Sequence, residues 1–176
     1  IMKKYRPTTA SRRHMTSINY REVLSGAPPF KPLTSGFKRT VGRNGAGRIT
    51  VRHKGGGHKR LYRFVDFWQE KRDVPGRVLS CQYDPNRTSF IALVAYRDGD
   101  KRYILLGQEM ADGAEIITSE KAPVQPGNRL PLSRIPVGTF VYNVEVHPGG
   151  GGKLVRAAGV GAEVLAHDAP YVLMRL

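Results

Sequence analysis

The pattern of apolar and polar positions divides the chain near residue 62. From there on, short runs rich in aromatic and β-branched residues alternate with clusters of Gly, Pro, Asp and Asn. Such runs predict β-strands, and the clusters between them predict tight turns. The first 61 residues lack this alternation and are dominated by Lys, Arg, Pro and Gly. The pattern predicts an all-β body preceded by an extended basic N-terminal arm.

Within residues 62–122, the pattern predicts five short strands, at 62–68, 77–83, 90–96, 101–106 and 115–118. Asp98-Gly99 predicts a tight hairpin, and Asp84-Pro85-Asn86-Arg87 and Asp112-Gly113 predict turns. Short strands joined by tight turns are typical of a small Greek-key barrel, so we expect an OB-fold domain here.

Residues 123–176 form a second predicted unit. Residues 123–136 contain four prolines and are interpreted as a linker. Further strands are predicted at 138–147, 153–157, 163–167 and 171–175, and Gly149–Gly152 predicts a flexible loop. Four strands leave an exposed edge, which proteins normally cover. We therefore expect an incomplete barrel that is completed by another chain or by a further part of the same protein.

The arm, residues 1–61, is expected to be extended around its prolines and disordered when free, because it has little apolar surface. A short helix is predicted at 17–24, with Ser17 as its N-cap. Four aromatic residues of the arm have two open interpretations, base stacking or packing on the adjacent domain: Tyr5, Tyr20, Phe30 and Phe37.

The net charge lies almost entirely in this first third. Residues 1–63 carry sixteen Lys or Arg against one acid, Glu22, whereas residues 64–176 carry thirteen of each sign. The stretch from Arg43 to Arg63 adds five glycines and two histidines and has no acid. Such a segment favours an external polyanion, and nucleic acid is the predicted partner. A membrane surface is not expected, since the arm lacks a periodic apolar face and no apolar run is long enough to span a bilayer.

Other chemistry is poorly supported by the motifs. Gly55-Gly56-Gly57 is not followed by the Lys and Ser or Thr of a phosphate-binding loop. His53 and His58 do not match a zinc spacing, so no metal or cofactor is expected. No nucleophile has a recognisable base and orienting acid, so no enzyme is predicted. The single Cys81 is interpreted as a small core residue.

RNA is favoured over DNA, because no helix suited to a DNA groove is predicted. A free-standing single-stranded RNA-binding OB module remains an alternative. It requires exposed aromatic residues on the barrel face, for which the candidates are Tyr83, Phe90, Tyr96 and Tyr103.

Several ordered motifs together resemble the family of large-subunit ribosomal protein two, in its bacterial and organellar form. They are Lys3-Lys4-Tyr5-Arg6-Pro7, Gly47-Arg48-Ile49-Thr50-Val51-Arg52-His53, Gly55-Gly56-Gly57-His58-Lys59-Arg60, Tyr83-Asp84-Pro85-Asn86-Arg87, Lys101-Arg102-Tyr103-Ile104-Leu105, Pro136-Val137-Gly138-Thr139 and Leu154-Val155-Arg156-Ala157-Ala158-Gly159. The resemblance implies an OB-fold domain followed by an SH3-like barrel. It also implies a structural role in translation: binding of large-subunit ribosomal RNA near the peptidyl-transferase region and support of assembly, beside other large-subunit proteins.

The basic arm and the resemblance together predict the RNA-binding residues. The arm supplies its own cations, and the resemblance adds the glycine-rich stretch, the turn at Asn86-Arg87 and the stretch from Lys153 to Arg156. The predicted set is Lys3, Lys4, Arg6, Arg12, Arg13, Arg43, Asn44, Arg48, Arg52, His53, Lys54, Gly55, Gly56, Gly57, His58, Lys59, Arg60, Arg63, Asn86, Arg87, Lys153 and Arg156.

The sequence differs from the family at its C-terminal end. Family members continue through the last strands of the SH3-like barrel into a basic tail. The expectation is therefore a split protein whose second polypeptide supplies the missing strands and the tail, and no peptidyl-transferase role is transferred to this chain. Splitting favours an organelle ribosome, in the mitochondrion, over a ribosome of the bacterial cytoplasm.

Overall fold

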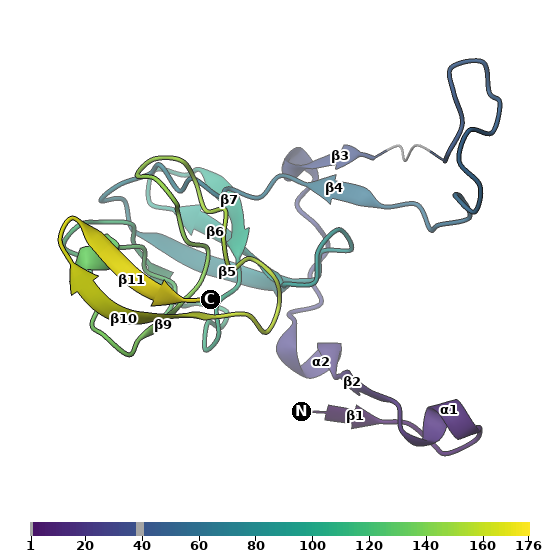
Figure 1. The fold of residues 1–176 in the computed structure, drawn as a ribbon, viewed down its shortest axis with the longest axis horizontal. Helices are drawn as coiled ribbons and strands as arrows, with labels where there is room; N and C mark the ends of the chain where they lie inside the picture. The colour runs from purple at the N-terminus through teal and green to yellow at the C-terminus, as the bar shows by residue number, and fades with distance from the viewer. Residues whose placement is uncertain (1, 38–40) are drawn as a thin grey trace.

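A β-rich body carries two projecting parts in the computed structural model, which describes residues 2–37 and 41–176 (Figure 1). The first is the N-terminal region with β1, β2, α1 and α2. The second is the hairpin of β3 and β4 with the long loop that joins these strands. No helix among the described residues is long and apolar enough to cross a membrane.

The N-terminal region is not uniformly extended, contrary to prediction. Strands β1 (Met2–Lys4) and β2 (Thr16–Ile18) pair antiparallel, and helix α1 (Ala10–Arg13) lies between them. Helix α2 (Tyr20–Val23) is shorter than the predicted helix at 17–24 and begins after Asn19. Ser17 is therefore not an N-cap: it lies in β2, and its hydroxyl is hydrogen-bonded to that of Tyr5 at 3.0 Å.

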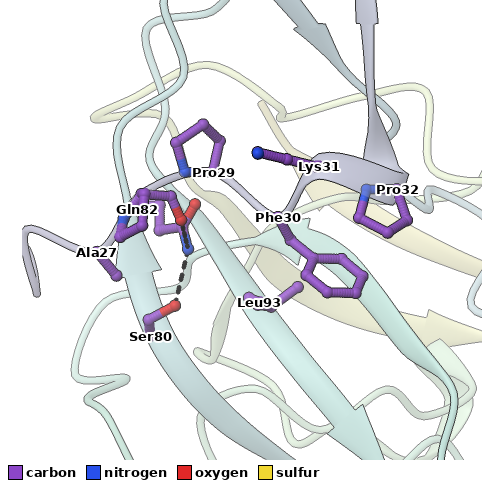
Figure 2. Close-up of a pocket in the computed structure, with 9 residues that line it drawn as sticks. Ala27, Pro29, Phe30, Lys31, Pro32, Ser80, Gln82 and Leu93 are labelled. Atoms are coloured by element: carbon purple, nitrogen blue, oxygen red, sulfur yellow. Dashed lines mark hydrogen bonds between the residues drawn. The ribbon is translucent and has the colours of Figure 1, made fainter.

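A proline-rich strap, residues 27–32, crosses the body and leads into the second projection (Figure 2). The Phe30 N–H donates to the Tyr103 hydroxyl at 2.8 Å, and that hydroxyl donates to Gln82 Oε1 at 2.9 Å. Figure 2 shows Gln82 turned toward Ser80, to which its amide donates at 2.8 Å. After the 3₁₀ turn η1 (Lys31–Leu33), β3 (Thr34–Gly36) pairs antiparallel with β4 (Leu61–Arg63).

The body is built on a curled four-stranded antiparallel sheet in the order β7-β6-β5-β8. Its strands are β5 (Gly76–Gln82), β6 (Ile91–Tyr96), β7 (Lys101–Leu105) and β8 (Glu115–Ile116). These four positions confirm the predicted strands within one or two residues. The turns at Asp84–Arg87, Asp98-Gly99 and Asp112-Gly113 are confirmed as well.

Both faces of this sheet are buried. Alternate residues of β6 point to opposite sides, so Ala92, Val94 and Tyr96 join one apolar cluster, while Ile91 and Leu93 join another. The second cluster is covered by side chains from outside the sheet, including Phe30 and Leu33 of the strap and its surroundings. Packing of these residues on the barrel core therefore fixes the point at which the projecting hairpin leaves the body.

The predicted strand at 62–68 is wrong for most of its length. Extended pairing ends at Arg63, and β4 pairs with β3 rather than with the barrel. Only Val65 makes an isolated parallel bridge to Tyr103. Asp66 Oδ1 accepts hydrogen bonds from the N–H groups of Trp68 and Gln69, which turns the backbone away from the sheet.

The C-terminal unit contains a three-stranded antiparallel sheet in the order β11-β10-β9. The unit also contains η2 (Leu132–Arg134), and its strands are β9 (Phe140–Val141), β10 (Ala162–Asp168) and β11 (Tyr171–Arg175). β10 and β11 confirm the predicted strands at 163–167 and 171–175, and β9 confirms part of the one predicted at 138–147. The predicted strand at 138–147 is wrong beyond Val141, because Asn143 has a positive φ of 54°. The predicted strand at 153–157 is reduced to a bridge between Leu154 and Val144.

The glycine loop of this unit is packed rather than free. Gly151 and Gly152 are buried, and the Gly152 N–H donates to the Phe67 carbonyl at 2.9 Å. A Cβ at position 152 would overlap the buried Asn143 side-chain oxygen. The loop predicted to be flexible therefore fixes the C-terminal unit against residues that follow β4.

Candidate nucleic-acid interface

The projecting segment, defined here as residues 41–60, is a loop organised by its own backbone. The Gly42 carbonyl accepts hydrogen bonds from the N–H groups of Thr50 at 2.8 Å and Val51 at 3.1 Å. Gly42 has a positive φ of 67°, and a Cβ there would overlap the Val51 carbonyl oxygen. Only glycine therefore permits the two arms of this loop to approach so closely.

Asn44 holds the tip of the projecting segment. Its N–H donates to the Arg48 carbonyl at 2.9 Å, and its side-chain oxygen accepts from the Arg48 N–H at 2.9 Å. Arg43 donates through Nη1 to the Gly47 carbonyl at 2.9 Å. Asn44 is thus a structural residue of the loop, while the guanidinium of Arg48 is left for contacts outside the chain.

The cations of this segment have no acidic partners among the residues that the structure describes. The side chains are exposed, apart from the half-buried Arg60. They belong to Arg43, Arg48, Arg52, Lys54, Lys59 and Arg60, and they share the segment with His53, His58 and Gly55, Gly56 and Gly57. Like charges this close together repel one another, so an external polyanion that neutralises them stabilises the segment.

A second basic surface is organised by a buried carboxylate. Asp84, in the turn after β5, is fully buried. Its Oδ1 accepts from the N–H of Asn86 at 2.9 Å and from the Asn86 side-chain amide at 3.0 Å. Its Oδ2 accepts from Arg87 Nε at 2.6 Å, and Arg63 Nη1 lies 4.0 Å from Oδ1. Asp84 therefore fixes the turn and the direction of two arginines.

Arginines from both folded units meet above one aromatic ring. The Arg156 guanidinium carbon lies 4.8 Å from the centre of the Phe67 ring, and that of Arg87 lies 5.5 Å from it. The contact of the exposed Arg156 is of the kind worth about 0.5–1 kcal/mol, whereas the Arg87 side chain is mostly buried. The Ala158 N–H also donates to Thr88 Oγ1 at 3.2 Å, which joins the two loops.

The end of the projecting segment reaches the same place. Arg60 Nη1 donates to the Pro85 carbonyl at 2.7 Å, and the Asn86 amide donates to the Leu61 carbonyl at 2.8 Å. The structure thus brings together five predicted residues from three parts of the chain, which we call the arginine surface: Arg60, Arg63, Asn86, Arg87 and Arg156.

The other predicted residues lie elsewhere. Lys153 is exposed after the glycine loop. The N-terminal group, Lys3, Lys4, Arg6, Arg12 and Arg13, lies on β1, α1 and the residues between them, away from the projecting segment (Figure 1). Within that group, Lys3 and Arg12 both lie near the Tyr5 ring, at 5.2 and 5.6 Å from its centre. The predicted site is therefore three basic surfaces, of which the projecting segment and the arginine surface adjoin at Arg60.

Sequence reasoning did not identify Asp84 and Phe67 as parts of the site. Asp84 was explained by turn propensity alone, and Phe67 was assigned to a strand. A signal was present in the acid directly before a predicted RNA-binding turn, because an acid in such a place is suited to hold an arginine rather than to meet a phosphate.

No reactive centre is visible in the described part of the chain. Cys81 is buried in the barrel core, as predicted, and burial together with the neighbouring Asp112 raises the pKa of its thiol to about 12. A thiol with so high a pKa is a poor nucleophile at neutral pH. No group of three or more His, Cys, Asp or Glu suited to a metal occurs among the described residues.

Two family matches cover most of the chain. Residues 30–118 match the family described as Ribosomal Proteins L2, RNA binding N-terminal domain, and residues 125–176 match Ribosomal Proteins L2, C-terminal domain. The chain belongs to the ribosomal protein L2 family. It is therefore a structural protein of the large ribosomal subunit that binds ribosomal RNA, and the resemblance noted in the sequence is confirmed.

The matched domains also agree with the observed architecture. The all-β class is confirmed, and the curled sheet followed by the three-stranded unit fits an OB-fold and an SH3-like barrel of the L2 type. The alternative of an extra-ribosomal single-stranded RNA-binding module is not favoured. Two of its four candidate aromatic residues, Tyr96 and Tyr103, are buried in the barrel core.

Proposed function

We propose that the three basic surfaces are the contacts of this L2-family chain with ribosomal RNA. The residues are those predicted from the sequence: the N-terminal cations, the projecting segment with its glycines and histidines, the arginine surface, and Lys153. The observation that carries the proposal is the exposed, acid-free projecting segment, whose cations have no ionic partner among the described residues.

In this proposal the surfaces have different tasks. The projecting segment enters between RNA helices, where Lys and Arg neutralise phosphates and release counterions. Its glycines let main-chain N–H groups approach the backbone. The arginine surface is preorganised by Asp84 and Phe67, so its guanidinium groups lose less conformational freedom on binding than free side chains would.

The proposal divides the chain into a basic RNA-binding arm at 1–61, an OB-fold domain at 62–122 and an SH3-like barrel at 123–176. The chain would act without catalysis, supporting assembly and the peptidyl-transferase region together with other large-subunit proteins. The edge of β11 supports a further proposal, that a second polypeptide pairs with this sheet, since an open edge strand presents unpaired N–H and C=O groups. We place the chain in an organelle ribosome, with the mitochondrion favoured over a bacterial cytoplasm.

The RNA contacts are tested by salt dependence. Arg52→Ala with Lys59→Ala should weaken binding of the chain to a large-subunit ribosomal RNA transcript. It should also reduce the slope of log K against log salt by about one for each lost phosphate contact. The matched control removes the same charge elsewhere, through Lys121→Ala with Arg134→Ala, both exposed. If both pairs reduced the slope equally, binding would follow net charge alone and the proposed site would be wrong.

A further inference from the structure

Three aromatic side chains, the exposed Phe37 and Phe64 and the half-buried Tyr62, form a row on the projecting hairpin. Phe37 follows β3, and Tyr62 and Phe64 belong to β4 and the residue after it. The ring centres of Phe37 and Tyr62 are 6.2 Å apart, and those of Tyr62 and Phe64 are 5.4 Å apart. Phe37 remains 49% exposed and Phe64 51%. We call these three residues the aromatic row.

The aromatic row is not part of the barrel core. Neither of the two apolar clusters includes any of its residues. Tyr20 makes a useful contrast, because it is also half-exposed but packs on Tyr83 and Phe90, with ring centres 5.5 and 5.6 Å away. Rings that contact one another stabilise the two-stranded hairpin. That role leaves half of Phe37 and Phe64 facing solvent, which costs free energy unless a partner covers them.

The charge around the row indicates what that partner is. The row brackets the projecting segment, since Phe37 precedes it and Tyr62 and Phe64 follow it. Residues 41–63 contain Lys and Arg but no acid. The domain described as RNA binding, residues 30–118, includes all three rings. A π face beside unneutralised cations suits a nucleotide, because one strand can give its base to the ring and its phosphates to the cations.

We propose that the aromatic row is a stacking site for unpaired bases of ribosomal RNA, an inference that rests on the proposed function. Stacking does not distinguish bases strongly, so the site selects for an unpaired, accessible base rather than for a sequence. The proposal assigns base stacking to one aromatic residue of the arm and packing on the body to two others. Phe37 stacks on RNA, whereas Phe30 and Tyr20 pack against the body.

The test compares two probes with equal numbers of phosphates: a ten-nucleotide oligoadenylate and an abasic strand of the same length. The full chain should bind the oligoadenylate more tightly. Phe37→Leu with Phe64→Leu should weaken oligoadenylate binding about five- to a hundredfold, while abasic binding and the salt slope stay unchanged. Phe64→Trp keeps a large π face and should retain tight binding. Phe140→Leu, at a ring that is 70% exposed on β9, is the matched control and should change neither affinity.

Two results would overturn the stacking site. One is unchanged oligoadenylate binding by the double variant, and the other is an equal loss for both probes, which would show a purely structural role. Failure of the proposed function itself looks different, because Arg52→Ala with Lys59→Ala would then leave both probes and the salt slope unchanged.

Discussion

The curled sheet of the body and the projecting segment are stabilised in different ways. Val94 and Ile104 of the sheet are fully buried, so removal of apolar surface from water stabilises their position. Ile49 of the segment is 64% exposed, and the loop is held by backbone hydrogen bonds around Gly42. The sheet is stabilised by this burial, to which side chains from outside the sheet such as Phe30 and Phe67 contribute. The segment is mostly exposed, and in the proposed function RNA neutralises its charge and stabilises it.

The two regions should differ most in how much the free energy of unfolding falls when an aliphatic side chain is truncated. Ile104→Ala should lower the free energy of unfolding by about 2–5 kcal/mol, because it leaves a cavity between packed strands. Ile49→Ala should change it by less than about 0.5 kcal/mol. Urea unfolding followed by circular dichroism measures both variants. Equal losses would mean that the segment belongs to the cooperative core.

The buried carboxylate at the junction should produce the next largest effect. Asp84→Ala removes the partner of Arg87 and leaves the Asn86 N–H without its acceptor, which should cost about 2–4 kcal/mol in unfolding free energy. Asp98→Ala, at an exposed turn acid, is the control and should cost less than about 1 kcal/mol.

The same variant separates positioning from charge in RNA binding. Loss of one negative charge by itself favours binding to a polyanion. If Asp84 positions Arg87 as proposed, the Asp84→Ala chain should nevertheless bind ribosomal RNA more weakly, whereas Asp98→Ala should bind as well or better. Filter binding at a salt concentration common to all variants measures this. Tighter binding by the Asp84 variant would remove the arginine surface from the RNA contacts.

Sequence reasoning located the strands of the body well, because their patterns are local. β5, β6 and β7 alternate or run apolar between strong turn signals, and Asp98-Gly99 fixes a hairpin within a few residues. The same reasoning failed at 62–68 and 138–147. There, aromatic and β-branched composition predicted strands, but Asp66 and Asn143 turn the backbone, so Phe67 and Tyr142 pack against the barrel sheet from irregular segments.

The candidate site was predictable as composition but not as geometry. Lys and Arg in the first third, and the resemblance carried by the glycine-rich stretch, identified residues whose contacts with RNA stay a prediction. The meeting of Arg87 and Arg156 on Phe67 was not predictable, since it depends on the buried Gly151 and Gly152 fixing one unit against the other. A run of glycines in a sequence indicates a conformationally free backbone. Only the residues packed around these glycines in the structure show that the backbone is fixed here.

The smallest expected effect concerns acid, and it distinguishes paired from unpaired cations. Lys71 donates to Asp98 and lies 2.9 Å from Asp100, and these contacts lower the pKa of both carboxyl groups below the ordinary value of 3.8. A carboxyl group whose pKa is lower in the folded state than in the unfolded state stabilises the fold at pH values above its unfolded-state pKa. That stabilisation is lost as the pH falls through the folded-state pKa. The stability of the body should therefore fall slightly more steeply, as the pH falls through and below 3.8, than it would without Lys71.

Lys71→Met should reduce this acid dependence, although Arg102 continues to pair with Asp100 and keeps the change small. Lys54→Met removes a cation of the projecting segment that has no acidic partner among the described residues, so it should leave the acid dependence unchanged. Urea midpoints at a series of pH values, read from circular dichroism, measure both. An equal change in the two variants would mean that the segment's cations interact with the acids of the body over long range, and the two regions would then not be electrostatically independent.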